Sequence, residues 1–151
     1  MPEKKTLKRA SEDKRRGKAP STQAGEFVRE EMDHVREGKH GARSAKQAIA
    51  IGLSKARRAG VKLPPPKKGQ ASARTRAQAA RDNAKGSNPA APAPSRKRSR
   101  AVTSALKREG HAAASRTALS RQAHASAKKR GVASRSQAAR KAARTRARGY
   151  R

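Results

Sequence analysis

Arginine and lysine are the side chains most able to bind a partner, because the chain has few acids to neutralise their charge. The sequence holds 41 of them against 10 Asp and Glu, a formal net charge of +31 over 151 residues. Residues 1–37 contain 10 basic and 8 acidic residues, whereas residues 38–151 contain 31 basic residues and two acids, Asp82 and Glu109. A polyanion would relieve the self-repulsion of the second segment, so the pattern predicts binding to nucleic-acid phosphates.

The candidate phosphate contacts are concentrated in the last third of the chain, where arginine exceeds lysine. The forked guanidinium group of arginine suits paired contacts to phosphate oxygens. The full set is Lys39, Arg43, Lys46, Arg57, Arg58, Arg96, Lys97, Arg98, Arg100, Arg116, Arg121, Lys128, Lys129, Arg130, Arg135, Arg140, Lys141, Arg144, Arg146 and Arg148.

A glycine-containing turn, GKHGARS at residues 38–44, precedes a predicted helix. Backbone N–H groups and the helix dipole at such a position can hold a phosphate. The turn is not a Walker loop, because its glycine spacing differs and no strand precedes it. The two interpretations are a phosphate site and an ordinary turn between helices.

Four acids, Glu26, Glu30, Asp33 and Glu37, follow one face of the predicted helix before this turn. The face could hold the chain's own basic tail, bind another basic protein, or lie in solvent. We expect it to be exposed, with no pocket to shift the pKa of a carboxyl group. No nucleophile, base and pocket converge, so the sequence does not predict an enzyme or a cofactor.

A metal site could be drawn from His34 and His40 together with Glu30 or Asp33. The spacing does not match a recognised ligand pattern, and we expect both histidines at the surface. The sequence therefore predicts no metal site.

Two helices position these groups. The first follows Pro20, with Ser21 or Thr22 as its cap, and runs to about Glu37 before Gly38. Its apolar positions share one arc at helical spacing. They are Ala24, Phe27, Val28, Met32 and Val35.

The second helix begins with a capping box at residues 44–47, in which Ser44 and Gln47 bond reciprocally to the backbone. It runs to about Ala59, and Gly60 suits the left-handed position that follows a helix. Gly52 would let the two helices approach closely. The pattern predicts a helical hairpin.

The predicted fold is mostly α-helical and disordered. From Lys67 onward the chain has five large apolar residues. Burying five such side chains cannot offset the entropy lost on ordering this segment, which is ~1–2 kcal/mol per residue. Any independent fold is therefore expected before Pro64. The predicted organisation is a flexible arm at 1–19, the hairpin at 20–63, a linker at 64–95 and a basic tail at 96–151 that becomes helical on binding.

No segment resembles a membrane span or a signal peptide, since the longest apolar run is Ala48–Leu53. The tail lacks the bulky apolar residues that a membrane-surface helix needs. Phe27 and Tyr150 are the only aromatic residues, which argues against base stacking on single strands. We expect a soluble cytoplasmic protein.

The string KQAIAIGLSKAR at residues 46–57 resembles the signature of a small bacterial family of unknown function. The resemblance covers about residues 27–60, with Val28, Met32, His34, Gly38 and Lys39 fitting the preceding helix. Lys55 stands where the family would have an acid. The resemblance implies a small helical unit and no known reaction.

The tail loosely resembles bacterial histone-like proteins rich in alanine, lysine and arginine, which implies association with the nucleoid. We therefore expect non-specific nucleic-acid binding by phosphate neutralisation, with DNA as the polymer. The alternatives are an RNA- or ribosome-associated protein and an adaptor that binds a protein through the hairpin.

Overall fold

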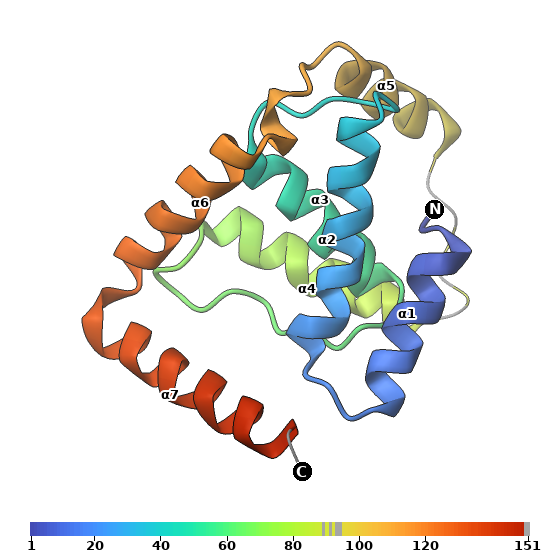
Figure 1. Ribbon diagram of the computed structural model, residues 1–151. Helices are drawn as coiled ribbons and strands as arrows, with labels where there is room; N and C mark the ends of the chain where they lie inside the picture. Colours follow the sequence, from blue (N-terminus) through green and yellow to red (C-terminus); the bar gives the residue numbers. More distant parts are fainter. Residues whose placement is uncertain (89, 91, 93–94, 150–151) are drawn as a thin grey trace. The chain divides into compact units, whose positions relative to one another are not determined.

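A computed structural model describes residues 1–88, 90, 92 and 95–149 of the chain. These residues form seven α-helices and one 3₁₀ helix, with no strand among them (Figure 1). The prediction of a mostly disordered chain is therefore wrong. The chain divides into two compact units, residues 1–115 and residues 116–151, which are described separately.

The hairpin consists of α2 (Pro20–Arg36) and α3 (Ala45–Arg58), which pack against each other where the sequence predicts two helices. The start of α2 differs from the prediction, because Ala19 is the cap residue and no side chain caps the helix. Pro20 takes the first helical position, where a missing N–H costs nothing. The helix ends at Arg36, and Gly38, which follows the C-cap residue Glu37, has a φ of +74°.

Helix α3 has the predicted cap, since Ser44 Oγ accepts a hydrogen bond from Gln47 N–H at 3.2 Å. The Gln47 side chain reaches back one residue further than a capping box requires, and accepts from Arg43 N–H at 2.8 Å. At the other end Gly60 has a φ of +89°, and Val61 N–H donates to the Ala56 carbonyl at 3.1 Å. This is the Schellman arrangement that glycine permits.

Gly52 is the point of closest approach between α2 and α3. A Cβ atom on this residue would lie 2.7 Å from Val28 Cα. Real Cβ atoms do not approach a backbone so closely, so the two helices can pack at this distance only because Gly52 has no side chain.

Helix α1 (Lys4–Arg15) forms in the segment predicted as a flexible arm, and packs on α2. Thr6 and Ala10, one turn apart, are its buried residues. The prediction missed this helix because its apolar content is low, and the buried face consists of small side chains.

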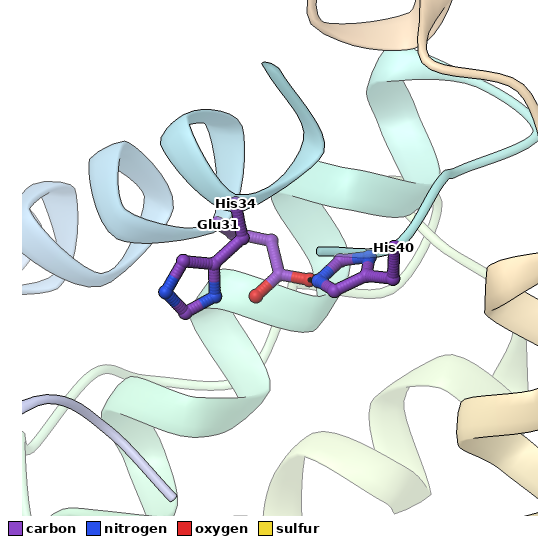
Figure 2. A group of neighbouring side chains, drawn as sticks. All are labelled: Glu31, His34 and His40. Carbon is purple, nitrogen blue, oxygen red and sulfur yellow. Dashed lines mark ion pairs between the residues drawn. The ribbon is translucent and has the colours of Figure 1, made fainter. Parts of the chain in front are cut away.

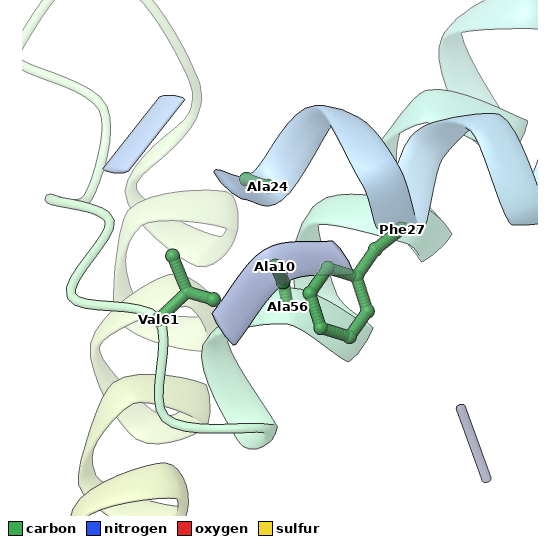
Figure 3. Packing of buried hydrophobic residues seen from close by; sticks show 5 residues of the cluster. All are labelled: Ala10, Ala24, Phe27, Ala56 and Val61. Carbon is green, nitrogen blue, oxygen red and sulfur yellow. The ribbon is translucent and has the colours of Figure 1, made fainter. Parts of the chain in front are cut away.

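A cluster of buried apolar residues draws on four segments (Figure 3). Phe27 of α2 is 1% exposed and lies among small side chains from α1, α2 and α3. The cluster comprises Ala10, Ala24, Phe27, Ala56 and Val61, with Leu53 and Leu63 packed against it. One aromatic ring is enough to fill the space between these helices, because the surrounding alanines let the helices pack closely.

Helix α4 (Ala73–Ser87) packs against α3 within the predicted linker. Asp82, one of the two acids of the basic segment, is buried here and accepts from Ser54 Oγ at 2.6 Å. Asn83 Nδ2 donates to the Leu63 carbonyl at 3.0 Å. The predicted linker therefore continues the folded unit through Ser87. Residues 89, 91, 93 and 94 of that linker lie outside the described residues.

Helix α5 (Arg96–Lys107) buries no residue, but the segment after it returns to the hairpin. The 3₁₀ helix η1 (Ala112–Ala114) packs on α2 and α3, and Arg36 Nε donates to the Ala114 carbonyl at 3.2 Å. The expectation that the fold ends before Pro64 is wrong, because alanines of η1, from the predicted tail, are buried against the hairpin helices α2 and α3.

The second unit contains α6 (Arg116–Lys129) and α7 (Gly131–Gly149), and neither helix has a buried residue. Gly131, with a φ of +70°, follows Arg130 at the junction of the two helices. Both helices are formed in the structure, in a segment that the sequence predicts to be disordered in the free protein. Alanine has the highest helix propensity of the amino acids, which favours helix despite the charge. Tyr150 lies outside the described residues.

Within the described part of the chain, no helix combines the length and the apolarity needed to cross a membrane.

The close approach at Gly52 leads to a paired prediction. Replacing Gly52→Ala should lower the free energy of unfolding by ~1–3 kcal/mol, because the added methyl group overlaps the α2 backbone. Replacing Gly25→Ala, where a Cβ atom would meet nothing within 4 Å, should raise it by ~0.5–1 kcal/mol. Urea denaturation followed by circular dichroism measures both, and equal stability of the two variants would contradict the packing described.

Candidate functional site

Most of the predicted phosphate contacts are exposed cations with no hydrogen bond or ion pair from their side chains to other described residues. Arginine and lysine side chains in this state are available to an external anion. This group comprises Arg43, Lys46, Arg96, Lys97, Arg98, Arg100, Arg116, Arg121, Lys128, Lys129, Arg130, Arg140, Lys141, Arg144 and Arg148.

Helix α7 carries the densest set of these cations. At 3.6 residues per turn its six cations fall on two arcs. Arg135 and Arg146 share one, and the opposite, broader arc holds Arg140, Lys141, Arg144 and Arg148. Arg135 Nε and Arg146 Nε each contact a carbonyl one turn back on the same helix, at 3.3 and 3.5 Å. Residues 116–151 hold 12 Lys and Arg and no acid, so nothing within this unit neutralises them.

Arg57 was predicted to contact phosphate, and this prediction is wrong. The side chain is buried, and its guanidinium group donates to the Leu63 and Pro64 carbonyls at 3.3 Å each. Burial lowers the pKa of Arg57, against the opposing effect of Asp82. Arg57 therefore holds the chain after α3 in place.

Lys39 and Arg58 are exposed but partnered. Lys39 Nζ lies 3.0 Å from Glu37 and 3.2 Å from Glu3, and these contacts raise the pKa of Lys39, Glu37 most. Arg58 Nε donates to the Ser54 carbonyl at 3.3 Å and lies 3.8 Å from Asp82. An external phosphate would have to compete with these groups.

The turn at residues 38–44 does not offer its backbone to a phosphate. Gly41 N–H and Ala42 N–H donate to the carbonyls of Leu106 and Gly110, at 2.9 and 3.0 Å. A Cβ atom on Gly41 would overlap the Glu109 carbonyl, so only glycine allows this contact. Of the two interpretations, the structure supports the ordinary turn, here bound to the last turn of α5 and to the segment that follows it.

The expectation that the acids of α2 are exposed is wrong for its central pair. Glu30 is 5% exposed and the neighbouring Glu31 is 0% exposed. Lys55 of α3 neutralises both, with its Nζ 3.3 Å from Glu30 Oε1 and 2.6 Å from Glu31 Oε2. Buried carboxylates require such a partner, because removing a charge from water is costly.

Helix α1 covers the same face of α2. Glu3 N–H donates to Glu30 Oε2 at 3.0 Å, and Arg9 lies 3.7 Å from Glu26. Asp33 pairs with Arg36 and Glu37 with Lys39, so each acid of the predicted stripe has a partner within residues 1–58. The structure thus gives these acids partners other than the basic tail.

The sequence analysis did not predict that Lys55 is partly buried between the two acids, although its spacing along α3 indicates a buried face. Lys55 lies seven residues after Ala48, which is fully buried, and residues at this spacing share a helix face. This spacing is the feature of the sequence from which the partial burial of Lys55 could have been predicted.

The two histidines near Glu31 are largely covered, whereas we expected them at the surface. His40 Nε2 lies 3.1 Å from Glu31 Oε1, and His34 Nε2 lies 2.8 Å from Glu3 Oε1. Their side chains are 15% and 13% exposed. Figure 2 shows Glu31 between the two imidazole rings. Glu31, not Glu30 or Asp33, is the acid grouped with both histidines.

Comparison with known proteins finds one family model that matches the N-terminal part of the chain. Residues 4–68 match the family of unknown function DUF6496. This confirms the resemblance to a family of unknown function, and extends it from residues 27–60 to include α1 and the segment after α3. No curated protein and no solved structure matches the chain. The family match covers the buried charge cluster and does not reach α4–α7.

The role of Lys55 can be tested by removing its charge. Lys55→Met should lower the free energy of unfolding by ~3–5 kcal/mol, because it leaves two buried carboxylates without their cation. Lys46→Met, on the exposed side of α3, should change it by less than ~0.5 kcal/mol. Chemical denaturation at neutral pH measures both, and similar values would show that Lys55 does not neutralise the pair.

Glu30 should make the stability depend on pH. Burial opposes its ionisation, but hydrogen bonds from Thr6 and Glu3 N–H and the charge of Lys55 outweigh burial and hold its pKa below the usual 4.5. A carboxyl group whose pKa is lower in the folded state stabilises the fold above its unfolded pKa. That stabilisation is lost as the pH falls through the folded pKa.

We therefore expect Glu30→Gln to be less stable than the wild type at neutral pH and to lose less stability between about pH 6 and pH 3. Glu12→Gln is the control, because the Glu12 side chain contacts no other charged group among the described residues. Denaturation midpoints across this range measure the effect. A wild-type pH dependence in Glu30→Gln would exclude Glu30 as a source.

Proposed function

We propose that this protein binds duplex DNA without sequence preference, through phosphate contacts made by its C-terminal helices. The observation that carries the proposal is α7, an exposed helix of 19 residues with six cations and no acid. In a cell with a nucleoid, such a protein would be associated with it.

The distribution of charge on α7 suits a groove better than a flat surface. The helix is about 28 Å long, and the major groove of B-form DNA, ~12 Å wide, admits one α-helix. Cations on two opposite arcs would reach the phosphates on both sides of such a groove. Alanine at the intervening positions leaves room for close approach.

Two features favour duplex DNA over RNA. The major groove of A-form RNA is deep and narrow, and does not admit a helix in this way. Recognition of single-stranded RNA relies on aromatic stacking, and Phe27 is buried in the core of the first unit. The RNA- or ribosome-associated alternative thus lacks a structural feature that supports it.

The adaptor alternative is also less favoured. The apolar faces of the hairpin are covered by α1, α4 and η1, and Phe27 and Val35 are buried. Among the described residues the exposed large apolar side chains are Met1, Leu7, Val102 and Val132, which come from separate segments. Scattered residues of this kind do not mark a protein-binding face.

The driving force is the release of counterions from DNA. Each phosphate contact should contribute about −0.9 to the slope of log K against log salt on duplex DNA. Binding would also relieve the repulsion among the unpaired cations of residues 116–151, so we expect affinity to fall steeply as salt rises.

A charge-matched pair of variants tests this assignment. The first replaces Arg140, Lys141, Arg144 and Arg148 of α7 with Gln, and the second replaces Lys4, Lys5, Lys8 and Lys14 of α1 with Gln. Both lose four charges, and all eight side chains are exposed. Fluorescence anisotropy with labelled duplexes of unrelated sequence gives the salt slope for each.

We expect the α7 variant to lose up to about 3.6 from the magnitude of the slope, and the α1 variant to lose much less. Equal losses would mean that net charge alone drives binding and would overturn the assignment to α7. Competition with structured RNA at ~0.15 M salt separates the two polymers. Tighter binding to RNA would replace DNA as the partner.

A further inference from the structure

We propose that Glu31, His34 and His40 bind a divalent transition-metal ion of the Zn²⁺ class. The three residues lie at the C-terminal end of α2 and in the turn that follows it (Figure 2). Each offers one ligand atom, and these atoms lie within 4.8 Å of one another. The proposal is independent of DNA binding, because none of the three residues belongs to the exposed cations.

The carboxylate of Glu31 has one oxygen available for a metal. The residue is 0% exposed, so water does not satisfy it. Oε2 is paired with Lys55 at 2.6 Å, whereas Oε1 faces His40 Nε2 at 3.1 Å. A metal bound through Oε1 would leave the Lys55 pair intact.

His40 has its two ring nitrogens directed at two acceptors. Nδ1 donates to the Gly41 carbonyl at 3.0 Å, and Nε2 faces the Glu31 carboxylate. A neutral imidazole carries one N–H, which Nδ1 uses, and therefore presents a lone pair at Nε2. A lone pair facing a carboxylate oxygen requires a cation between them, either a proton or a metal.

His34 repeats this arrangement from the other side. Its Nε2 bonds to Glu3 Oε1 at 2.8 Å, which leaves Nδ1 to face the cluster. Histidines that bind metals commonly donate the second ring N–H to a carboxylate or a carbonyl, and such outer contacts fix the tautomer. Each histidine here has such an outer acceptor, which is Glu3 for His34 and the Gly41 carbonyl for His40.

The fold itself positions the three proposed ligand residues. Glu31 and His34 are three residues apart on α2 and share a face of the helix. His40 lies in the turn whose Gly41 and Ala42 N–H groups donate to carbonyls of Leu106 in α5 and of Gly110 after it. The turn is therefore anchored at the position of its ligand.

The donor set indicates the class of metal. Two imidazoles and one carboxylate suit Zn²⁺ and the neighbouring late transition metals, whereas Mg²⁺ prefers oxygen ligands. Ligand bonds of about 2.0–2.2 Å place tetrahedral ligand atoms about 3.4 Å apart. The contact between His40 and Glu31 is already near this separation, so a modest movement of His34 would close the site and leave the fourth position for water.

Isothermal titration calorimetry of the full chain with ZnCl₂, and separately with MgCl₂, tests the proposal. We expect one equivalent of Zn²⁺ to bind with micromolar or lower Kd, and Mg²⁺ not to bind. His34→Gln and His40→Gln should each weaken Zn²⁺ binding at least about tenfold. Glu3→Gln should weaken it about 10- to 100-fold, through loss of the outer contact to His34.

His124→Gln is the matched control, because His124 is an exposed histidine of α6 and is not one of the three clustered residues. Its Zn²⁺ affinity should equal that of the wild type. Thermal unfolding followed by circular dichroism confirms that each variant is folded, and Zn²⁺ should raise the midpoint of the wild type and of His124→Gln only.

Three results would overturn the proposal. The first is no Zn²⁺ binding by the wild type at concentrations up to about 100 µM, which would show that protons and ion pairs alone satisfy the cluster. The second is unchanged binding in folded His34→Gln and His40→Gln. The third is an equal loss in His124→Gln, which would indicate binding by scattered surface histidines.

Discussion

Two adjacent carboxylates on α2, Glu30 and Glu31, lie out of contact with water and have to be neutralised by other parts of the chain. Lys55 brings α3 against them, and Glu3 N–H brings the start of α1. A buried charge without a partner would cost several kcal/mol, so these contacts set how α1, α2 and α3 are arranged. The apolar cluster around Phe27 contains few large side chains. The stability of this unit therefore depends strongly on the pairing of its buried charges.

The same interaction explains how the charge of the chain is distributed. The acids are concentrated in the first unit, where they pair with Lys55, Arg9, Arg36 and Lys39. Of the two acids in the basic segment, Asp82 is buried against α3. The unit at residues 116–151 is left with cations alone. The buried acids of the N-terminal unit are thus paired internally, whereas exposed cations of both units, such as Arg98 and Arg144, have no ion pair among the described residues.

The hairpin illustrates what could be predicted. Helical spacing of apolar residues located α2 and α3, and glycines at 38 and 60 located their ends. The prediction of disorder was wrong because it counted large apolar side chains and neglected alanine. Ala79, Ala113 and Ala114 are buried on the hairpin. Small residues add little area each, but they allow backbones to approach closely.

By itself the sequence determined which segments of the hairpin are helical, the predominance of cations after residue 38, and the absence of acids that could neutralise the tail. These follow from local propensity and composition, which do not depend on distant residues. Only the tertiary structure decided that Glu31 meets His40 and Lys55, that Arg57 is buried, and that the turn at 38–44 is bonded to the end of α5 and the segment after it. Burial and pairing of charge depend on which helix covers which face, and that is a property of packing.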